Sequence, residues 1–130
     1  SFRFLPIWIG TIEAVSIAYA QEGYVHPRPQ THDLLIDIVE SLNASISEVC
    51  ITDIQEKTYF AEITLNTLEG DVTLSARPSD AIALAIRSNS KITVDTEIFS
   101  NNSIILIDEN NEEIQEFKEF IDDISPDDFS

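Results

Sequence analysis

The sequence contains no methionine, one cysteine, three glycines and only seven lysines and arginines among its 130 residues. A single cysteine excludes an internal disulfide and fits a reducing compartment, so we predict a cytoplasmic location. No apolar run approaches the roughly 20 residues of a membrane-spanning helix, and no signal-peptide pattern opens the chain, so we predict no membrane association. Because there is no methionine, we expect the sequence to be a trimmed or incompletely recorded product.

The scarcity of basic residues leaves a formal net charge of −17, with 24 acids against seven bases. Proteins that hold nucleic acid through bulk charge are basic, so this balance excludes tight, salt-driven coating of a duplex. Three of the four arginines nevertheless fall in or beside two Arg-Pro motifs: Arg28, Arg77 and Arg87. Local arginine sites of this kind can still bind a polyanion weakly.

The acidity is concentrated at the C-terminus, where residues 108–130 hold ten acids and one base. Hydrophobic residues make up 43% of the chain, which is enough for a core, and the length predicts one domain. We place this domain at residues 1–107 and predict an acidic linker and an amphipathic helix over 108–130. This helix would pack on the domain or a second subunit, or bind a partner as a dedicated tail. Its apolar stripe consists of Ile114, Phe117, Ile121 and Ile124.

Hydrophobic patterning predicts an α+β domain. Residues 5–20 indicate a strand, a turn or a short helix, followed by a proline-rich loop at 23–29. One helix is expected from residue 31 to a stop at Asn43, and a second, apolar nearly all round and therefore buried, over 81–87. The expected strands are residues 49–54, 58–67, 72–75, 92–94 and 104–107, with a hairpin turn at 68–71.

The order of elements repeats, and each copy passes through an Arg-Pro pair into a helix with an Asp in its first turn. The first copy reads Arg-Pro-Gln-Thr-His-Asp at 28–33, and the second reads Arg-Pro-Ser-Asp at 77–80. Proline is preorganised for the first helical turn, Thr31 and Ser79 are the expected N-caps, and the carboxylates offset the helix dipole. The arginines are left unexplained, so they either pair with the aspartates or are presented to a ligand.

The same geometry permits a functional interpretation. A helix N-terminus flanked by arginine is a ready anion site, because an Arg fork matches phosphate oxygens. His32 can act as a general acid or base. Glu13, Asp33 and Asp80 can supply hard oxygen ligands for Mg²⁺ or Mn²⁺. From spacing alone, an Arg–Asp structural network, small-anion binding and catalysis all stay open. His26, in the loop, is expected to be a solvated residue.

Three separated motifs occur in order along the chain. They are Leu-Pro-Ile-Trp-Ile-Gly at 5–10 with Glu-Ala at 13–14, Arg-Pro and Thr-His-Asp-Leu-Leu within 28–35, and Arg-Pro-Ser-Asp-Ala-Ile-Ala-Leu-Ala at 77–85. Together with Tyr-Phe-Ala at 59–61, they resemble the bifunctional nuclease domain family. The likeness is continuous over residues 5–99, and the Ser-Pro-Asp-Asp-Phe ending at 125–129 resembles bacterial members.

The resemblance implies a compact α+β domain of two similar β-β-β-α-α halves around one curved, barrel-like sheet, often as a dimer. It also implies metal-assisted cleavage of both DNA and RNA. Members of the family carry about two further strands before the first motif, which we expect to be missing from this chain. The family's motif positions here are Glu13, Arg28, His32, Asp33, Arg77, Ser79 and Asp80.

We therefore predict a nuclease that hydrolyses phosphodiester bonds in DNA and RNA with Mg²⁺ or Mn²⁺, and that works as a homodimer on weakly bound nucleic acid. The candidate residues are His32, Asp33, Asp80 and Glu13 for catalysis, Arg28, Arg77 and Ser79 for substrate binding, and Glu13, Asp33 and Asp80 for the metal.

Two alternatives remain open. The first is a non-enzymatic regulatory module that binds a small anion or a protein partner at the two Arg-Pro helix starts. In the second, these elements are purely architectural and the function lies in the C-terminal segment. Burial of Arg28 and Arg77 against the two aspartates would favour architecture, whereas an open cleft shared with Glu13 would favour a site.

Overall fold

A computed structural model describes residues 2–106, and the expected helix within 108–130 lies outside this range. The described chain forms four helices and six strands, so the α+β prediction is confirmed. In order they are β1 (Phe2–Phe4), α1 (Thr11–Gln21), α2 (Thr31–Ser41), β2 (Ser45–Gln55), β3 (Thr58–Thr67), β4 (Gly70–Ala76), α3 (Pro78–Ser88), β5 (Lys91–Val94), α4 (Thr96–Asn102) and β6 (Ile104–Leu106). No helix within the described range is long and apolar enough to cross a bilayer.

The strands form two separate sheets. Four strands pair in the order β4-β3-β2-β5, in which β5 runs parallel to β2 and the other pairs are antiparallel. The remaining strands, β1 and β6, form a two-stranded antiparallel ribbon. A barrel requires its two edge strands to pair, and within residues 2–106 the edges β4 and β5 do not pair with each other. These residues therefore do not form the single barrel-like sheet that the resemblance implied, and the two-halves arrangement stays a prediction.

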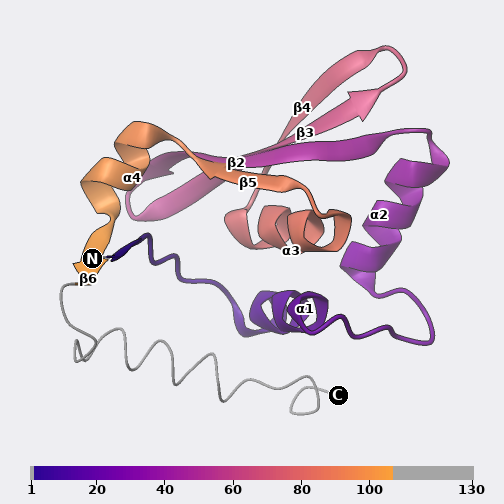
Figure 1. The fold of residues 1–130 in the computed structure, drawn as a ribbon, viewed down its shortest axis with the longest axis horizontal. Coiled ribbons are helices and arrows are strands. Elements are labelled where there is room, and N and C mark those ends of the chain that lie inside the picture. The colour runs from indigo at the N-terminus through magenta and orange to yellow at the C-terminus, as the bar shows by residue number, and fades with distance from the viewer. Residues whose placement is uncertain (1, 107–130) are drawn as a thin grey trace.

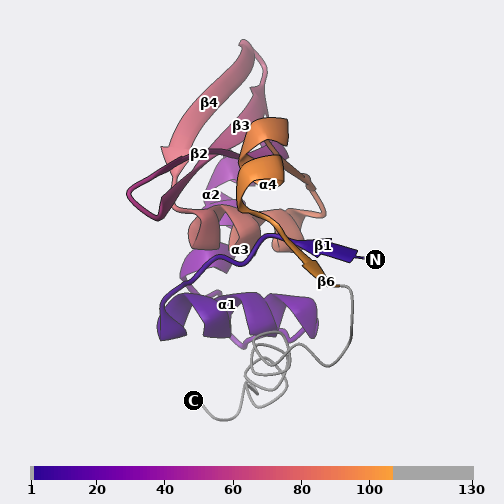
Figure 2. The ribbon, with the colours of Figure 1, turned by 90° about the vertical axis from the view of Figure 1, so that its left-hand side faces the viewer.

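Helix α3 lies between the four-stranded sheet and helix α1, so the molecule has three layers at this point (Figures 1 and 2). The alanines at 81, 83 and 85 are fully buried, because small side chains allow α3 to approach its neighbours closely. The core consists of Ile46, Val49, Ile51, Ala61, Ile63, Ala81, Leu84 and Ala85. The predictions of a buried second helix and of a strand at 58–67 are confirmed.

Both predicted N-caps were wrong by one or two positions. The N-cap of α2 is Gln30, whose side chain accepts from the backbone of Asp33 while the Asp33 carboxylate accepts from the Gln30 N–H. The N-cap of α3 is Arg77, and Pro78 opens the helix. The fixed φ of proline suits the first helical position, which moves the cap to the residue before it. Helix α4 was not predicted, since its seven residues carry too little periodicity.

Candidate active site

The first turns of three helices supply most of the predicted site residues. Glu13, Asp33 and Asp80 lie in the first turns of α1, α2 and α3, respectively. His32 precedes Asp33 in α2, and Arg77 caps α3. Helices α1 and α2 both pack on α3. This packing brings together polar side chains that are far apart in the sequence.

A chain of ion pairs and hydrogen bonds joins five side chains, which we call the His32 network. Arg77 lies 3.0 Å from Glu13 through Nη1 and donates to Asp80 through Nε at 2.9 Å. The other carboxylate oxygen of Asp80 lies 2.9 Å from His32 Nε2. On the opposite side of the ring, His32 Nδ1 lies 2.6 Å from the hydroxyl oxygen of Ser16. The network therefore runs from Glu13 through Arg77, Asp80 and His32 to Ser16.

The Asp80 carboxylate determines which nitrogen of His32 carries the proton. An ionised carboxylate can only accept, so Nε2 is the donor. In the neutral ring Nδ1 is then the acceptor, and the Ser16 hydroxyl donates to it. His32 is 9% exposed, so both hydrogen bonds are largely shielded from solvent. The basic nitrogen of the ring consequently faces Ser16.

The electrostatics of Asp80 and Arg77 keep both groups charged. Burial by itself raises the pKa of Asp80, but hydrogen bonds from Arg77 and His32, with their charges, outweigh burial and hold this pKa below its ordinary value of 3.8. Asp80 and, secondarily, Glu13 raise the pKa of Arg77. The Arg77 side chain is 64% exposed. It therefore presents a permanent positive charge to solvent at the edge of the His32 network.

A second ion pair lies behind the network. Arg87, whose side chain is 9% exposed, donates from Nε to Asp33 at 2.6 Å. Burial by itself raises the pKa of Asp33. The hydrogen bonds from Arg87 and from the Gln30 backbone lower it by more, so the pKa lies below its ordinary value of 3.8. Asp33 is thus held by Arg87 rather than by Arg28, and its carboxylate does not join the His32 network.

Gly10 permits the position of Glu13. A Cβ built on Gly10 would overlap the Glu13 carboxylate, although the backbone at Gly10 is in an ordinary extended conformation. A side chain at position 10 would therefore displace the Glu13 carboxylate, although the φ of Gly10 does not itself call for glycine. Its lack of a side chain allows Glu13 to fold back over the helix start and reach Arg77.

His32 forms a wall between two cavities. The arginine cavity, of about 560 Å³, has an apolar floor and a charged wall made by Glu13, His32, Arg77 and Asp80. The aromatic cavity, of about 540 Å³, lies between α1, the loop before α2 and the start of α2. The residues of the aromatic cavity that carry polar or aromatic groups are Thr11, Ser16, Tyr19, Tyr24, His26, Gln30, Thr31, His32 and Arg87.

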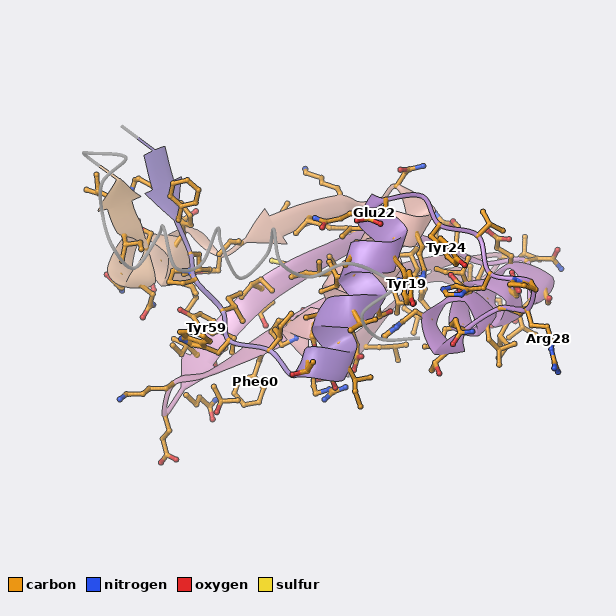
Figure 3. The ribbon with its side chains drawn as sticks, turned by 90° about the horizontal axis from the view of Figure 1, so that it is seen from below. Tyr19, Glu22, Tyr24, Arg28, Tyr59 and Phe60 are labelled. Atoms are coloured by element: carbon orange, nitrogen blue, oxygen red, sulfur yellow. The ribbon has the colours of Figure 1, made fainter. Side chains whose placement is uncertain are left out.

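The two Arg-Pro helix starts are not equivalent. Arg77 is exposed and shares the arginine cavity with Glu13, as a functional site requires. Arg28 is also exposed but forms no hydrogen bond or ion pair among residues 2–106, and its side chain projects away from the helices (Figure 3). Ser79, a predicted substrate-binding residue, is 5% exposed and lines neither cavity.

The three carboxylates predicted to hold a metal are not gathered in one place. Glu13 and Asp80 both contact Arg77, whereas Asp33 contacts Arg87. Over residues 2–106, no group of three or more His, Cys, Asp or Glu side chains could hold a metal ion. Each carboxylate already has an arginine partner in the place where a cation would bind. In this conformation the donor set does not fit a resident divalent ion.

The sequence interpretation missed the roles of Ser16 and Arg87. Ser16 is the one serine in the largely apolar run from Ala14 to Ala20, and Arg87 is a lone charge after the apolar run 81–86. A single polar residue in a run that is expected to be buried needs a partner, and this signal was available. The identity of the partner was not, because Arg87 and Asp33 are 54 residues apart.

The structure is thus an α+β domain with a cluster of charged and polar side chains around His32 and Arg77, and comparison with known proteins gives its family. The bifunctional nuclease domain model matches residues 1–106, so the chain belongs to the bifunctional nuclease domain family. An uncharacterised protein of Mycobacterium tuberculosis is 41% identical over 98% of this chain and 81% of its own length.

Plant members of the family are more distant. Bifunctional nuclease 2 of Arabidopsis thaliana is 29% identical over 80% of this chain. Bifunctional nuclease 1 of Oryza sativa subsp. japonica is 26% identical over 79% of this chain. In both cases the match covers 32% of the plant protein.

Proposed function

We propose that this protein is a nuclease that hydrolyses phosphodiester bonds in DNA and RNA at the His32 network. The observation that carries the proposal is the hydrogen-bonded line from exposed Arg77 through Asp80 to His32, at 2.9 Å for each contact. Family membership and the names of the plant relatives supply the substrate class. A cytoplasmic location, inferred from the single cysteine, stays a prediction.

Each residue of the network has a defined role in this proposal. Arg77 binds the non-bridging oxygens of the phosphate, because its guanidinium is exposed and permanently charged. His32 acts as general base through Nδ1, the nitrogen left without a proton by its contact with Asp80: as the water oxygen bonds to phosphorus and the ester P–O bond breaks, His32 takes up one proton of the water and then returns it to the leaving oxygen. The Ser16 hydroxyl relays that proton, since it occupies the hydrogen-bonding position on Nδ1. Asp80 orients the ring and stabilises the imidazolium that forms.

A requirement for Mg²⁺ or Mn²⁺ stays a prediction and has no support from the donor set, since Glu13 and Asp80 share Arg77 as their partner. We derive no step through a metal ion. Cleavage assays with Mg²⁺, with Mn²⁺ and with a chelator measure the requirement directly. If the chelator abolishes cleavage, the active protein must differ from this structure: Arg77 must have moved away from Glu13 or Asp80, so that the freed carboxylate can bind the ion.

The test compares variants on single-stranded and duplex substrates. His32→Gln is expected to lower kcat by about 100-fold or more, the usual contribution of general acid–base catalysis. Arg77→Ala is expected to raise KM by about tenfold, because it removes the charge–phosphate contact. Arg28→Ala is the matched control and is expected to leave both constants unchanged, since Arg28 lies outside the network.

Two outcomes would contradict the proposal. Equal activity in the wild type and His32→Gln would assign the cleavage to a contaminating nuclease. Thermal stabilisation by inorganic phosphate, lost in Arg77→Ala and without turnover of any nucleic acid, would favour the anion-binding regulatory module instead.

A further inference from the structure

The aromatic cavity lies on the far side of His32 from Arg77, and its chemistry differs from that of the arginine cavity. Tyr19 and Tyr24 line one end of it with ring centroids 5.2 Å apart, and His26 packs edge-on against both rings. Tyr24 is 52% exposed, so one aromatic surface is open to solvent. Figure 3 shows the two tyrosines close together beside the end of α1.

The aromatic cavity offers no available cation, although Arg87 lines it. The Nε, Nη1 and Nη2 groups of Arg87 donate to Asp33, to the Ala83 carbonyl and to the Ser16 carbonyl. A phosphate would find no free positive charge here. The cavity is also lined by the polar side chains of Thr11, Gln30 and Thr31 and by the Ser16 hydroxyl, which is bonded to His32. Aromatic faces with a few polar groups suit a flat ring that carries hydrogen-bonding edges.

A ring nitrogen of His26 in this region lacks a hydrogen-bond partner among the described residues. His26 Nε2 is buried and forms no hydrogen bond within the described residues, although the residue as a whole, expected to be solvated, is only partly buried. Buried polar atoms without a partner are rare in folded proteins. Its position beside Tyr19 and Tyr24 places this unsatisfied nitrogen at the aromatic end of the cavity.

The net charge of the protein indicates what a nucleic-acid ligand must use for affinity. With 24 acids and seven bases, the chain repels a phosphate backbone at long range. Base stacking on aromatic side chains does not depend on that charge and tolerates any sequence. A nuclease with this composition therefore needs contacts to the bases, and the aromatic cavity is the one beside His32 that can provide them.

We propose that the aromatic cavity is a nucleoside subsite, which takes one unpaired base of a strand whose adjacent phosphate lies on Arg77. The inference rests on the proposed nuclease function and narrows its substrate class to single-stranded or unpaired DNA and RNA. A paired base hides its faces in the stack and cannot enter a pocket. Because His32 is the wall shared by the two cavities, the sugar–phosphate link between them passes this residue.

The experiment measures binding without cleavage. The full chain is titrated with a fluorescent phosphorothioate-linked thymidine pentamer and with an abasic strand of the same length and linkages. The wild type is expected to bind the base-bearing strand about tenfold more tightly, since stacking of one base has an effect of this order. This preference should persist in raised salt, whereas the binding common to both strands should weaken.

Variants of Tyr24 locate the base. Tyr24→Leu is expected to remove the preference, and Tyr24→Phe is expected to keep it, because the ring face is retained. Phe60→Leu is the matched control: Phe60 is 37% exposed and lies at the other end of the molecule, at the β2–β3 hairpin (Figure 3). It should leave the preference intact.

The possible results separate the subsite from the nuclease activity. Equal binding of the two strands by the wild type, or an unchanged preference in Tyr24→Leu, would overturn the subsite. Thymidine monophosphate that binds as tightly as the pentamer would identify a free nucleotide as the ligand and overturn the strand substrate. A base preference without any cleavage would support the subsite and contradict the nuclease. Cleavage of an abasic strand with ordinary phosphodiester linkages at the full rate would support the nuclease and contradict the subsite.

Discussion

At the level of single residues, the site depends on how the two nitrogens of His32 are held. Asp80 accepts from Nε2 and, at the same time, from Arg77, so one carboxylate connects the proton-transfer group to the phosphate-binding group. A change at Asp80 would therefore disturb both functions. The Ser16 hydroxyl touches the network only through its contact with Nδ1, so its role can be tested separately.

Ser16→Ala distinguishes a relay from a nucleophile. The hydroxyl lies 2.6 Å from the histidine, a geometry that a covalent mechanism also uses. If Ser16 relays a proton, a water molecule can take its place, and we expect kcat to fall by less than about tenfold. Steady-state kinetics of Ser16→Ala on a nucleic-acid substrate provide the measurement. Complete loss of activity in a folded Ser16→Ala protein would instead indicate a phosphoseryl intermediate.

Asp33 is expected to contribute stability that depends on pH. Its folded-state pKa lies below the ordinary value of 3.8, so the unfolded chain binds this proton more readily. The stabilisation is therefore complete well above pH 3.8 and is lost as the pH falls through the lowered pKa of the folded state. The difference in urea midpoint between the wild type and Asp33→Asn should shrink from about pH 6 to about pH 3.

A matched control for this prediction lies in the same helix. Asp37 is exposed and forms no ion pair among residues 2–106, so Asp37→Asn should show no comparable change with pH. A wild type that keeps its full advantage over Asp33→Asn at the lower pH would show that the ion pair with Arg87 does not set the pKa of Asp33.

At the level of elements, Arg87 ties three helices together. It extends from the last turn of α3 and reaches Asp33 in α2 and the Ser16 carbonyl in α1 at 3.1 Å, while also bonding to its own helix at Ala83. These helices carry Glu13, His32 and Arg77. The spacing of the His32 network therefore depends on a residue outside it.

Replacing Arg87 should destabilise the protein more than replacing an exposed arginine. Arg87→Ala removes three hydrogen bonds and leaves Asp33 without its partner, which we expect to cost about 2–3 kcal/mol, less than a fully buried pair because Asp33 is a third exposed. Arg28→Ala is expected to change stability by less than about 0.5 kcal/mol. Denaturant midpoints for both variants test this difference, and equal midpoints would contradict the role of Arg87.

At the level of the whole molecule, α2 has an apolar stripe that the described residues leave open. Leu34, Ile38 and Leu42 are spaced by four residues on one face, and they are 48%, 48% and 73% exposed. This part of the apolar face of α2 is not covered by the other residues of 2–106. Contiguous exposed apolar surface commonly marks a contact with another molecule.

The homodimer expected from the resemblance stays a prediction, and this stripe is where we place its interface. Light scattering should show a dimer for the wild type and a monomer for Ile38→Glu, because a buried charge without a partner opposes association. Val25→Glu is the matched control, since Val25 is 87% exposed but lies in the loop before α2 rather than on the stripe. A monomeric wild type at micromolar concentration would contradict the prediction.

The sequence by itself determined the class and most of the elements of this protein. Strand 58–67 alternates buried and exposed side chains, and the alanine-rich run after Asp80 is apolar on every side, so each pattern has one physical solution. The motif order at residues 5–10, 28–35 and 77–85 was specific enough to identify the family, which the family model confirmed over residues 1–106. Local periodicity and motif order do not depend on long-range contacts.

Only the tertiary structure decided which charges meet. The two Arg-Pro motifs look alike in sequence, yet Arg77 joins Asp80 and Glu13 at a cavity while Arg28 points away and Asp33 pairs with Arg87. These pairings join residues up to 64 positions apart (Glu13 to Arg77), and they follow from the packing of α1 and α2 on α3. Ion pairing depends on distance in space, which a local sequence pattern does not encode. The sequence therefore gives the net charge of the chain, −17, whereas the fold determines that Arg77 is the arginine exposed beside the His32 network.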